Sequence, residues 1–272
     1  MVAIHATQSA DSDAPEIPVR TLSSADLNLS LREGLSDFLA MRGDLIFVGL
    51  LYPLVGFVAA WLTLGYNFMP LFFPIAAGIS LLGPIVAIGF YELARRREAG
   101  LESTWSHFFD VRKRPSVDGL GAVAGLLISI FVLWVAAAGG LYVALWGMNV
   151  PDSIGAFLTR LFTTPEGWTL IIVGNLIGAV FAVLVLAISI VSLPMLVDCN
   201  VEARTAVRTS IRAFRANKGM MIRWGLTVGV LLVLGSIPLF IGLAVVLPWM
   251  GYATWHLYTH VIDRSGLEIC KE

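Results

Sequence analysis

Charged residues are scarce in this chain: they make up only 14% of its 272 residues, whereas soluble domains carry about 25%. Hydrophobic residues make up 57%, and the mean hydropathy is +0.82. This scarcity of charge excludes an ordinary soluble domain and indicates a polytopic membrane protein. The net charge of −1 says little, because the positions of the charges matter more than their sum.

Cysteine is almost absent as well. The two cysteines, Cys199 and Cys270, lie far apart and in no metal-type spacing. We therefore expect neither a disulfide framework nor a thiol-ligated zinc site. Residues 1–40 contain no apolar segment of the signal-peptide type, so we expect the first span to act as its own insertion signal.

Catalytic motifs are also missing. The chain has no strand pattern that could carry a dinucleotide or phosphate-binding loop, and nothing resembles a Ser-His-Asp site or a carboxylate pair with a pocket. We expect a protein that is not an enzyme, with no catalytic residues, no cofactor and no metal. Each basic segment adjoins an apolar span, so anionic lipid explains these segments better than nucleic acid does.

Long apolar runs predict an all-α membrane protein with six transmembrane helices. The expected spans cover about 45–64, 68–91, 119–146, 168–197, 220–236 and 239–258. The last two divide one apolar stretch at residues 235–238, because the whole stretch is too long for one span of about 20 residues. We expect a disordered tail over 1–22, a single membrane domain over 23–262 and a polar tail over 263–272.

Amphipathic segments flank these spans. Ser24 is an expected cap for a helix whose leucines at 27, 31 and 35 and Phe38 form one apolar stripe. A second short helix is expected after Ser153, in the loop 147–167. A third follows the fourth span and carries a basic arc, which we expect to contact anionic lipid headgroups; the arc consists of Arg204, Arg208, Arg212 and Arg215.

The positions of the basic residues predict the orientation. With the N-terminus inside, 17 of the 18 Lys and Arg residues lie on the cytoplasmic side, and Arg160 alone lies opposite. This asymmetry satisfies the positive-inside rule. We therefore expect both termini in the cytoplasm.

Three similar pieces suggest an internal repeat. Each has a proline in an even-numbered span, at Pro84, Pro194 and Pro248, and an ionisable residue eight positions later; these residues are Glu92, Glu202 and His256. The pattern predicts three hairpins in a pseudo-threefold repeat, with the three ionisable residues as a candidate functional ring. A chance match of common Leu-Pro pairs is the alternative.

A few polar residues within or near the spans are candidates for chemistry. Glu92 and Asp198 lie at span ends, where Arg95 or Arg204 could pair with them; a proton relay is the alternative reading. Asn175 is expected to hydrogen-bond across to a neighbouring helix. We expect His107 to be solvated. The glycines of the third and fourth spans stand in pairs four residues apart, a spacing that lets helices pack closely; the pairs are Gly121 with Gly125 and Gly174 with Gly178.

His256 and His260 share one helical face at i and i+4, a spacing that can hold a metal. No Glu or Cys stands close enough in sequence to complete such a site. The neighbouring Trp255 and Tyr258 favour an aromatic belt at the membrane interface instead.

The segments 74–100, 192–221 and 247–262, which include LLGPIVAIGFYELARR and LPWMGYATWHLYTH, resemble one family. It comprises uncharacterised, predicted integral membrane proteins of proteobacteria, gathered under a domain of unknown function. The resemblance covers roughly residues 30–262. Tyr252 stands where the family pattern has a first histidine, while His256 matches. The resemblance implies a bacterial inner-membrane location and no established activity.

These observations favour a non-enzymatic accessory, scaffold or assembly factor of a larger, energy-transducing membrane assembly, with other membrane subunits as partners. The alternative function is a small-solute transporter or channel, which the internal repeat suggests. A membrane enzyme acting on lipid ranks third.

Overall fold

The computed structural model describes residues 17–41, 83–148, 151, 153–238, 241–265 and 267–270. Helices dominate this part of the chain and no strand longer than a single bridge occurs in it, which confirms the all-α class. The elements are α1 (Ser24–Ala40), α4 (Gly83–Glu98), the 3-10 helix η2 (Trp105–Lys113), α5 (Val117–Trp146), α6 (Ile154–Thr163), α7 (Pro165–Asp198), α8 (Ala203–Ala216), α9 (Lys218–Ser236), α10 (Leu243–Val261) and the 3-10 turn η3 (Glu268–Cys270).

Three of these helices, α5, α7 and α9, are long and apolar enough to cross a membrane. They agree closely with the predicted spans 119–146, 168–197 and 220–236. α10 occupies the predicted span 239–258. The predicted span 45–64 and most of 68–91 lie outside the described residues, so the six-span arrangement stays a prediction.

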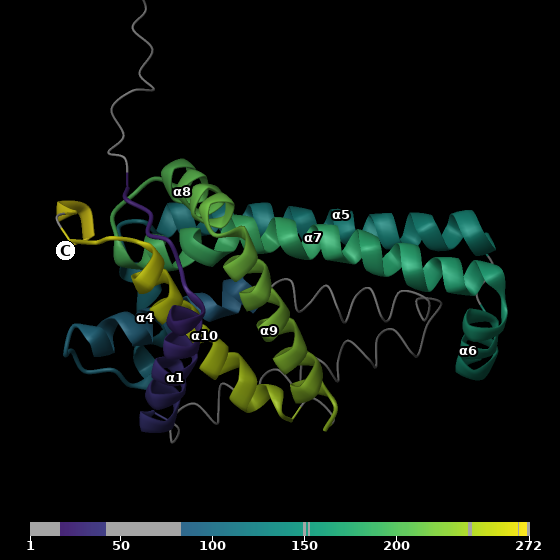
Figure 1. Cartoon of the computed structure of the whole chain (residues 1–272), viewed down its shortest axis with the longest axis horizontal. Coiled ribbons are helices and arrows are strands. Elements are labelled where there is room, and N and C mark those ends of the chain that lie inside the picture. Colours follow the sequence, from purple (N-terminus) through teal and green to yellow (C-terminus); the bar gives the residue numbers. More distant parts are fainter. Residues whose placement is uncertain are drawn as a thin grey trace, which may run out of the picture.

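α10 is the central helix of the described bundle. In Figure 1 it crosses between α1, α4 and α9. Its residues from Met250 to Trp255 are all buried. Two glycines bring neighbouring helices close: a Cβ on Gly34 of α1 would lie 2.4 Å from the backbone nitrogen of Ala253, and one on Gly251 would lie 2.7 Å from Phe90 Cβ. These crossings leave no space for a side chain, which fixes where α1 and α4 pack.

The α5–α7 hairpin reaches far beyond the other helices and carries α6 at its tip (Figure 1). α6 begins after the Ser153 cap, as predicted, and Arg160 stacks over the Trp146 ring at 4.5 Å. Inside the hairpin, Gly178 faces the Trp134 ring. Many large apolar side chains on the outer faces of α5 and α7 are exposed, as expected for helices surrounded by lipid.

α8 lies across the hairpin at the end away from α6 (Figure 1). Its inner face consists of small residues, and Ser210 there inserts into the α7 hydrogen-bond ladder. The Ser210 hydroxyl donates to the Ala187 carbonyl at 2.8 Å and accepts from the Val191 N–H at 3.2 Å. Side chains inserted into a ladder bend helices, and Pro194 weakens the same stretch of α7. α8 is therefore held by packing against α7 as well as by its basic face.

The prediction of a disordered tail through residue 22 is wrong for residues 17–22. Ile17 and Leu22 are buried. The Leu22 N–H donates to Asn217 Oδ1 at 2.7 Å, and the Arg20 N–H donates to the Val261 carbonyl at 2.8 Å. The segment 17–22 is mostly apolar although it follows a polar stretch, and burial of its apolar side chains together with backbone hydrogen bonds to α10 and to the α8–α9 junction orders it. Residues 1–16 lie outside the described part.

The described residues of the polar tail, 263–265 and 267–270, fold back toward the end of α7, and they carry a disulfide, contrary to the expectation from the sequence. Cys199, directly after α7, is bonded to Cys270 in η3. The Asn200 N–H donates to the Ile269 carbonyl beside it. The sequence did not predict this disulfide, because two cysteines 71 positions apart form no local pattern that indicates a bond. Nearby, the Ser265 hydroxyl and Arg20 lower the pKa of Asp263 to about 2.

Candidate functional site

Charged residues of the described core cluster in three places, two of them against the C-terminal half of α10 and one between α4 and the end of η2. They form three groups, which we call the Glu92 group, the Asp198 group and the histidine group. The last turn of α4 joins two of them, because Arg97 belongs to the histidine group and Glu98 to the Asp198 group.

The Glu92 group is a buried ion-pair network. The Glu92 side chain is 2% exposed; its Oε1 accepts from Arg95 Nη2 at 2.8 Å and its Oε2 from Arg114 Nε at 3.1 Å. The pairing with Arg95 agrees with the sequence prediction, since the two residues are one turn apart. Arg114 was not anticipated. It reaches Glu92 because η2 turns back under α4, where Phe108 packs against Phe90 with ring centroids 5.1 Å apart.

The Asp198 group ties α7 to α10 and to the C-terminal segment. Asp198 Oδ2 accepts from the Tyr258 hydroxyl at 2.8 Å and from Arg264 Nη1 at 3.3 Å. Glu98 accepts from the Trp255 indole N–H and pairs with Arg264. The expected partner of Asp198, Arg204, is instead an exposed residue of α8. Arg264 takes this place because the segment after α10 folds back over the end of α7.

The Asp198 carboxylate also lies beside the disulfide. One of its oxygens and the sulfur atoms of Cys199 and Cys270 are within 4.8 Å of one another. Such a set could hold a metal only as thiolates. Sulfur atoms joined to each other do not supply these ligands.

The histidine group joins α1 to α10. His256 Nε2 lies 2.8 Å from Asp37 Oδ2, and His256 Nδ1 lies 3.4 Å from Glu33 Oε2. His260 Nε2 lies 3.6 Å from the same Glu33 oxygen. Arg97 Nε donates to the other Asp37 oxygen at 2.7 Å. No Glu or Cys stands close enough to the two histidines in sequence to complete a site, but α1 brings the carboxylates of Glu33 and Asp37 to them in the structure.

The aromatic residues beside the histidines do not form an interface belt. Trp255 and Tyr258 are both 0% exposed, and their polar atoms bind the Asp198 group. The belt prediction is wrong because α10 is the central helix, so both faces of this segment pack against protein. His107, expected to be solvated, is half-buried, and its Nδ1 accepts from the Thr104 N–H at 3.2 Å.

No contact among the described residues joins the three members of the candidate ring. Glu92 is buried with its arginines, His256 pairs with α1, and Glu202 is exposed at the start of α8. Of the basic arc, Arg204, Arg208 and Arg215 are exposed. The fourth member, Arg212, donates to the Ile17 carbonyl.

Asn175 of α7 and two glycines of α5, Gly121 and Gly125, face away from the other described helices. Asn175 of α7 is exposed, and its Nδ2 donates to the Ile171 carbonyl of its own helix at 2.7 Å. No hydrogen bond joins Asn175 to another described helix, and because two predicted spans lie largely outside the described residues, the bond to a neighbouring helix stays a prediction. On α5, a Cβ built on Gly121 or Gly125 meets no described atom within 4 Å, whereas Gly178 of α7 packs against Trp134.

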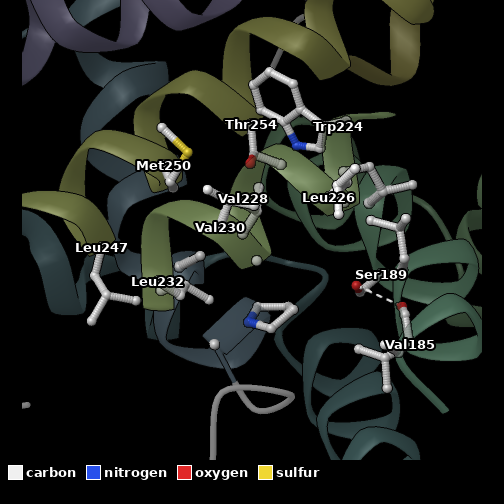
Figure 2. Close-up of a pocket in the computed structure, with 18 of the residues that line it drawn as sticks. Val185, Ser189, Trp224, Leu226, Val228, Val230, Leu232, Leu247, Met250 and Thr254 are labelled. Carbon is white, nitrogen blue, oxygen red and sulfur yellow. Dashed lines mark hydrogen bonds between the residues drawn. The ribbon is translucent and has the colours of Figure 1, made fainter. Parts of the chain in front are cut away.

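A cavity of about 710 Å³ lies between α4, α7, α9 and α10. Figure 2 shows its apolar lining, which includes Val185, Leu232 and Met250. The few polar groups at its wall include Ser189, whose hydroxyl donates to the Val185 carbonyl of its own helix. The cavity thus offers apolar surface rather than a constellation of reactive groups.

Sequence reasoning missed Glu33, Asp37, Glu98 and Arg264. Each contacts its partner from more than 60 positions away in the sequence. One local signal was present: Glu33 and Asp37 stand at i and i+4, so they share a face of α1 in the same way as the two histidines share a face of α10.

Residues 71–198 match the sequence profile of a family described as "Predicted integral membrane protein (DUF2189)". This match confirms the resemblance to an uncharacterised membrane family over that part of the chain. No curated protein and no solved structure matches the chain.

Proposed function

Starting from this match to a family of predicted integral membrane proteins, we propose that the protein is a non-catalytic scaffold that binds another membrane protein within the bilayer. The observation that carries the proposal is the outward-facing Asn175 of α7. The residue follows Trp168 by seven positions, about 10 Å along the helix. That places its carboxamide within the hydrocarbon if Trp168 lies at the membrane interface.

An outward-facing carboxamide in hydrocarbon is unfavourable unless it is hydrogen-bonded. The Asn175 side chain makes one described hydrogen bond, which leaves its second N–H and both lone pairs of Oδ1 without a described partner. A polar group of a partner helix would satisfy them, and such a bond is worth about 1 kcal/mol in a membrane.

The exposed small residues of α5 support the same function. Gly121, Gly125 and Ser129 stand at intervals of four and are all exposed. Small residues at this spacing let a second helix approach closely. The chain uses Gly178 for such an approach within its own hairpin, while no described helix uses Gly121 or Gly125.

The basic face of α8 would anchor the scaffold to anionic headgroups. Three of its four arginines are exposed, and each basic residue near an anionic surface contributes about 1 kcal/mol. Neither alternative function has a comparable observation among the described residues. The apolar cavity lacks the polar lining that a hydrated solute needs, and no catalytic constellation adjoins it.

The scaffold function is tested by replacing Asn175. We expect Asn175→Leu, and Gly125→Leu independently, to abolish photo-crosslinking between α7 or α5 and a second membrane protein in native membranes. Val180→Leu is the matched control, because Val180 is also exposed but lies about 140° around α7 from Asn175. Crosslinks that persist in Asn175→Leu and Gly125→Leu, or a wild-type protein that crosslinks only to lipid, would overturn the proposal.

We also propose a cytoplasmic location for both termini in a bacterial inner membrane, with six spans in three hairpins. The support is the basic-residue asymmetry. The disulfide between Cys199 and Cys270 favours the opposite orientation, because disulfides persist in oxidising compartments, whereas thiols in the cytoplasm stay reduced.

Reporter fusions distinguish these two orientations of the chain in the membrane. We expect a fluorescent protein joined after Glu272 to fluoresce, and a periplasm-dependent phosphatase inserted near Asp152 to be active. The matched control exchanges the two reporters, which should silence both. Phosphatase activity at the C-terminus would overturn the orientation and place the cysteines in the oxidising compartment.

A further inference from the structure

We propose that the cavity between α4, α7, α9 and α10 binds one acyl chain of an anionic phospholipid, whose headgroup lies at the Lys218 end of α9. The proposal does not depend on the scaffold function, because the described lining of the cavity includes neither Asn175 nor the exposed glycines of α5.

The cavity has the size and the surface of a site for a hydrocarbon chain. Its volume of about 710 Å³ lies within the usual range of ligand pockets, about 300–1,000 Å³. Along α9 its lining runs from Ile222 to Leu234, a rise of about 18 Å. That length is close to the depth of one leaflet, since the hydrocarbon core of a bilayer is about 30 Å thick. Most of the described lining residues are apolar, as a hydrocarbon chain requires.

The cavity is open toward the surroundings of α9. Ile222, Leu226 and Val233 belong to its lining, and all three are exposed. Because α9 is long and apolar enough to cross a membrane, a lipid chain can enter from this side without leaving the bilayer. Gly229 also lines the cavity, and a Cβ built on it meets no described atom within 4 Å. A chain can therefore lie directly against the α9 backbone.

Thr254 offers a hydrogen bond at one end of the cavity. The α9 and α10 helices meet at Gly235 and Gly242 and run antiparallel from there (Figure 1). Thr254, twelve residues after Gly242, is therefore level with Trp224, eleven residues before Gly235, and both line the cavity (Figure 2). Thr254 is 8% exposed, and its hydroxyl makes no hydrogen bond with the described residues. Buried hydroxyl groups need a partner, and an ester carbonyl of the lipid would accept from this one.

Lys218 supplies a positive charge at the same end. It precedes Ile222 by four positions, so it lies on the face of α9 that lines the cavity. Lys218 is exposed, and lysine is a common ligand of phosphate groups. A lipid with its chain in the cavity would thus place its glycerol ester near Thr254 and its phosphate near Lys218.

Lipid retained by the purified full chain tests the site. After incubation in mild detergent with equal amounts of phosphatidylglycerol and phosphatidylcholine, native mass spectrometry should show one phosphatidylglycerol retained per chain. Gly229→Phe should lose this lipid, because the ring fills the cavity from a position where its Cβ meets no described atom. Gly140→Phe is the matched control: its Cβ also meets no described atom, but it lies on α5, so the lipid should stay bound. Equal retention by Gly229→Phe and the wild type would overturn the proposal.

Two further variants test the two polar contacts separately. Lys218→Gln should weaken binding of phosphatidylglycerol alone by about fivefold, the contribution of one basic residue near an anionic headgroup. Thr254→Val should weaken both lipids by about fivefold, because both carry the ester carbonyl. Lys113→Gln, at an exposed lysine of η2, should bind both lipids as the wild type does. Unchanged lipid preference in Lys218→Gln would contradict the position of the headgroup.

Photo-crosslinking identifies what occupies the cavity. Phosphatidylglycerol with a photoreactive acyl chain should label the lining segments of α9 and α10. Labelling confined to α5 and α6 would indicate surrounding lipid only and would overturn the proposal. So would a photoreactive side chain at position 229 that crosslinks to residues 45–82 of the same chain, because the cavity would then be filled by the protein itself.

Discussion

Glu92→Ala is expected to lower the free energy of unfolding by about 3–5 kcal/mol. The substitution leaves Arg95 and Arg114 without their shared carboxylate, in a place where the Glu92 side chain is 2% and the arginine side chains 16% and 15% exposed. Removing one partner of a buried ion pair strands the remaining charge, which costs far more than the pair contributes when intact. Unfolding of the purified protein in mixed micelles measures the effect.

Glu202→Ala is the matched control for this change. Glu202 occupies the corresponding position of the predicted repeat but is exposed, so its removal should shift the unfolding free energy by less than about 0.5 kcal/mol. Glu92→Leu combined with Arg114→Leu should recover part of the loss, because Arg95 alone, instead of Arg95 and Arg114, is then left without the Glu92 carboxylate. An equal, small effect of Glu92→Ala and Glu202→Ala would contradict the buried network.

Gly34→Leu is expected to displace α1 from α10. The first added carbon would lie 2.4 Å from the Ala253 nitrogen and 2.5 Å from its Cα. The atoms in the way belong to the backbone of a buried helix, which moves less easily than the end of a flexible side chain. We therefore expect the free energy of unfolding to fall by about 3 kcal/mol, the upper end of the range for overpacked cores. Displacement would also separate Trp249 Nε1 from the Leu31 carbonyl, which it now meets at 2.9 Å.

Limited trypsin digestion measures this displacement. Arg32 is an exposed residue of α1, and cleavage there should become much faster in Gly34→Leu, because proteases cut backbone that has left its packed helix. Ser36→Leu adds the same side chain to the exposed face of the same helix and should be cleaved like the wild type. Unchanged cleavage of Gly34→Leu would show that α1 does not depend on this crossing.

The same crossing positions the histidine group. Glu33 and Asp37 flank Gly34 on α1, whereas both histidines belong to α10. A variant that separates the two helices should therefore also break the contact of Asp37 with His256.

The sequence alone determined where the helices of the hairpin and of α9 run. Apolar runs of spanning length predicted their positions to within a few residues, at 119–146, 168–197 and 220–236 against Val117–Trp146, Pro165–Asp198 and Lys218–Ser236 in the structure. The same local reasoning found the helix start at Ser153 and paired Glu92 with Arg95, because helix periodicity and capping depend on residues close in the chain. It placed the cap of α1 one residue late, since Ser23 and not Ser24 is the cap.

Only the tertiary structure decided which of these helices is central and which residues meet around it. α10 is not among the described helices that are apolar enough to qualify as spans, but low hydropathy does not say which helices will surround it. In the structure α1, α4, α7 and α9 all pack against it. The pairing of Asp37 with His256 joins residues 219 positions apart. It depends on a helix crossing at Gly34, and no local pattern encodes which two helices will cross, because their meeting is set by the packing of the whole chain.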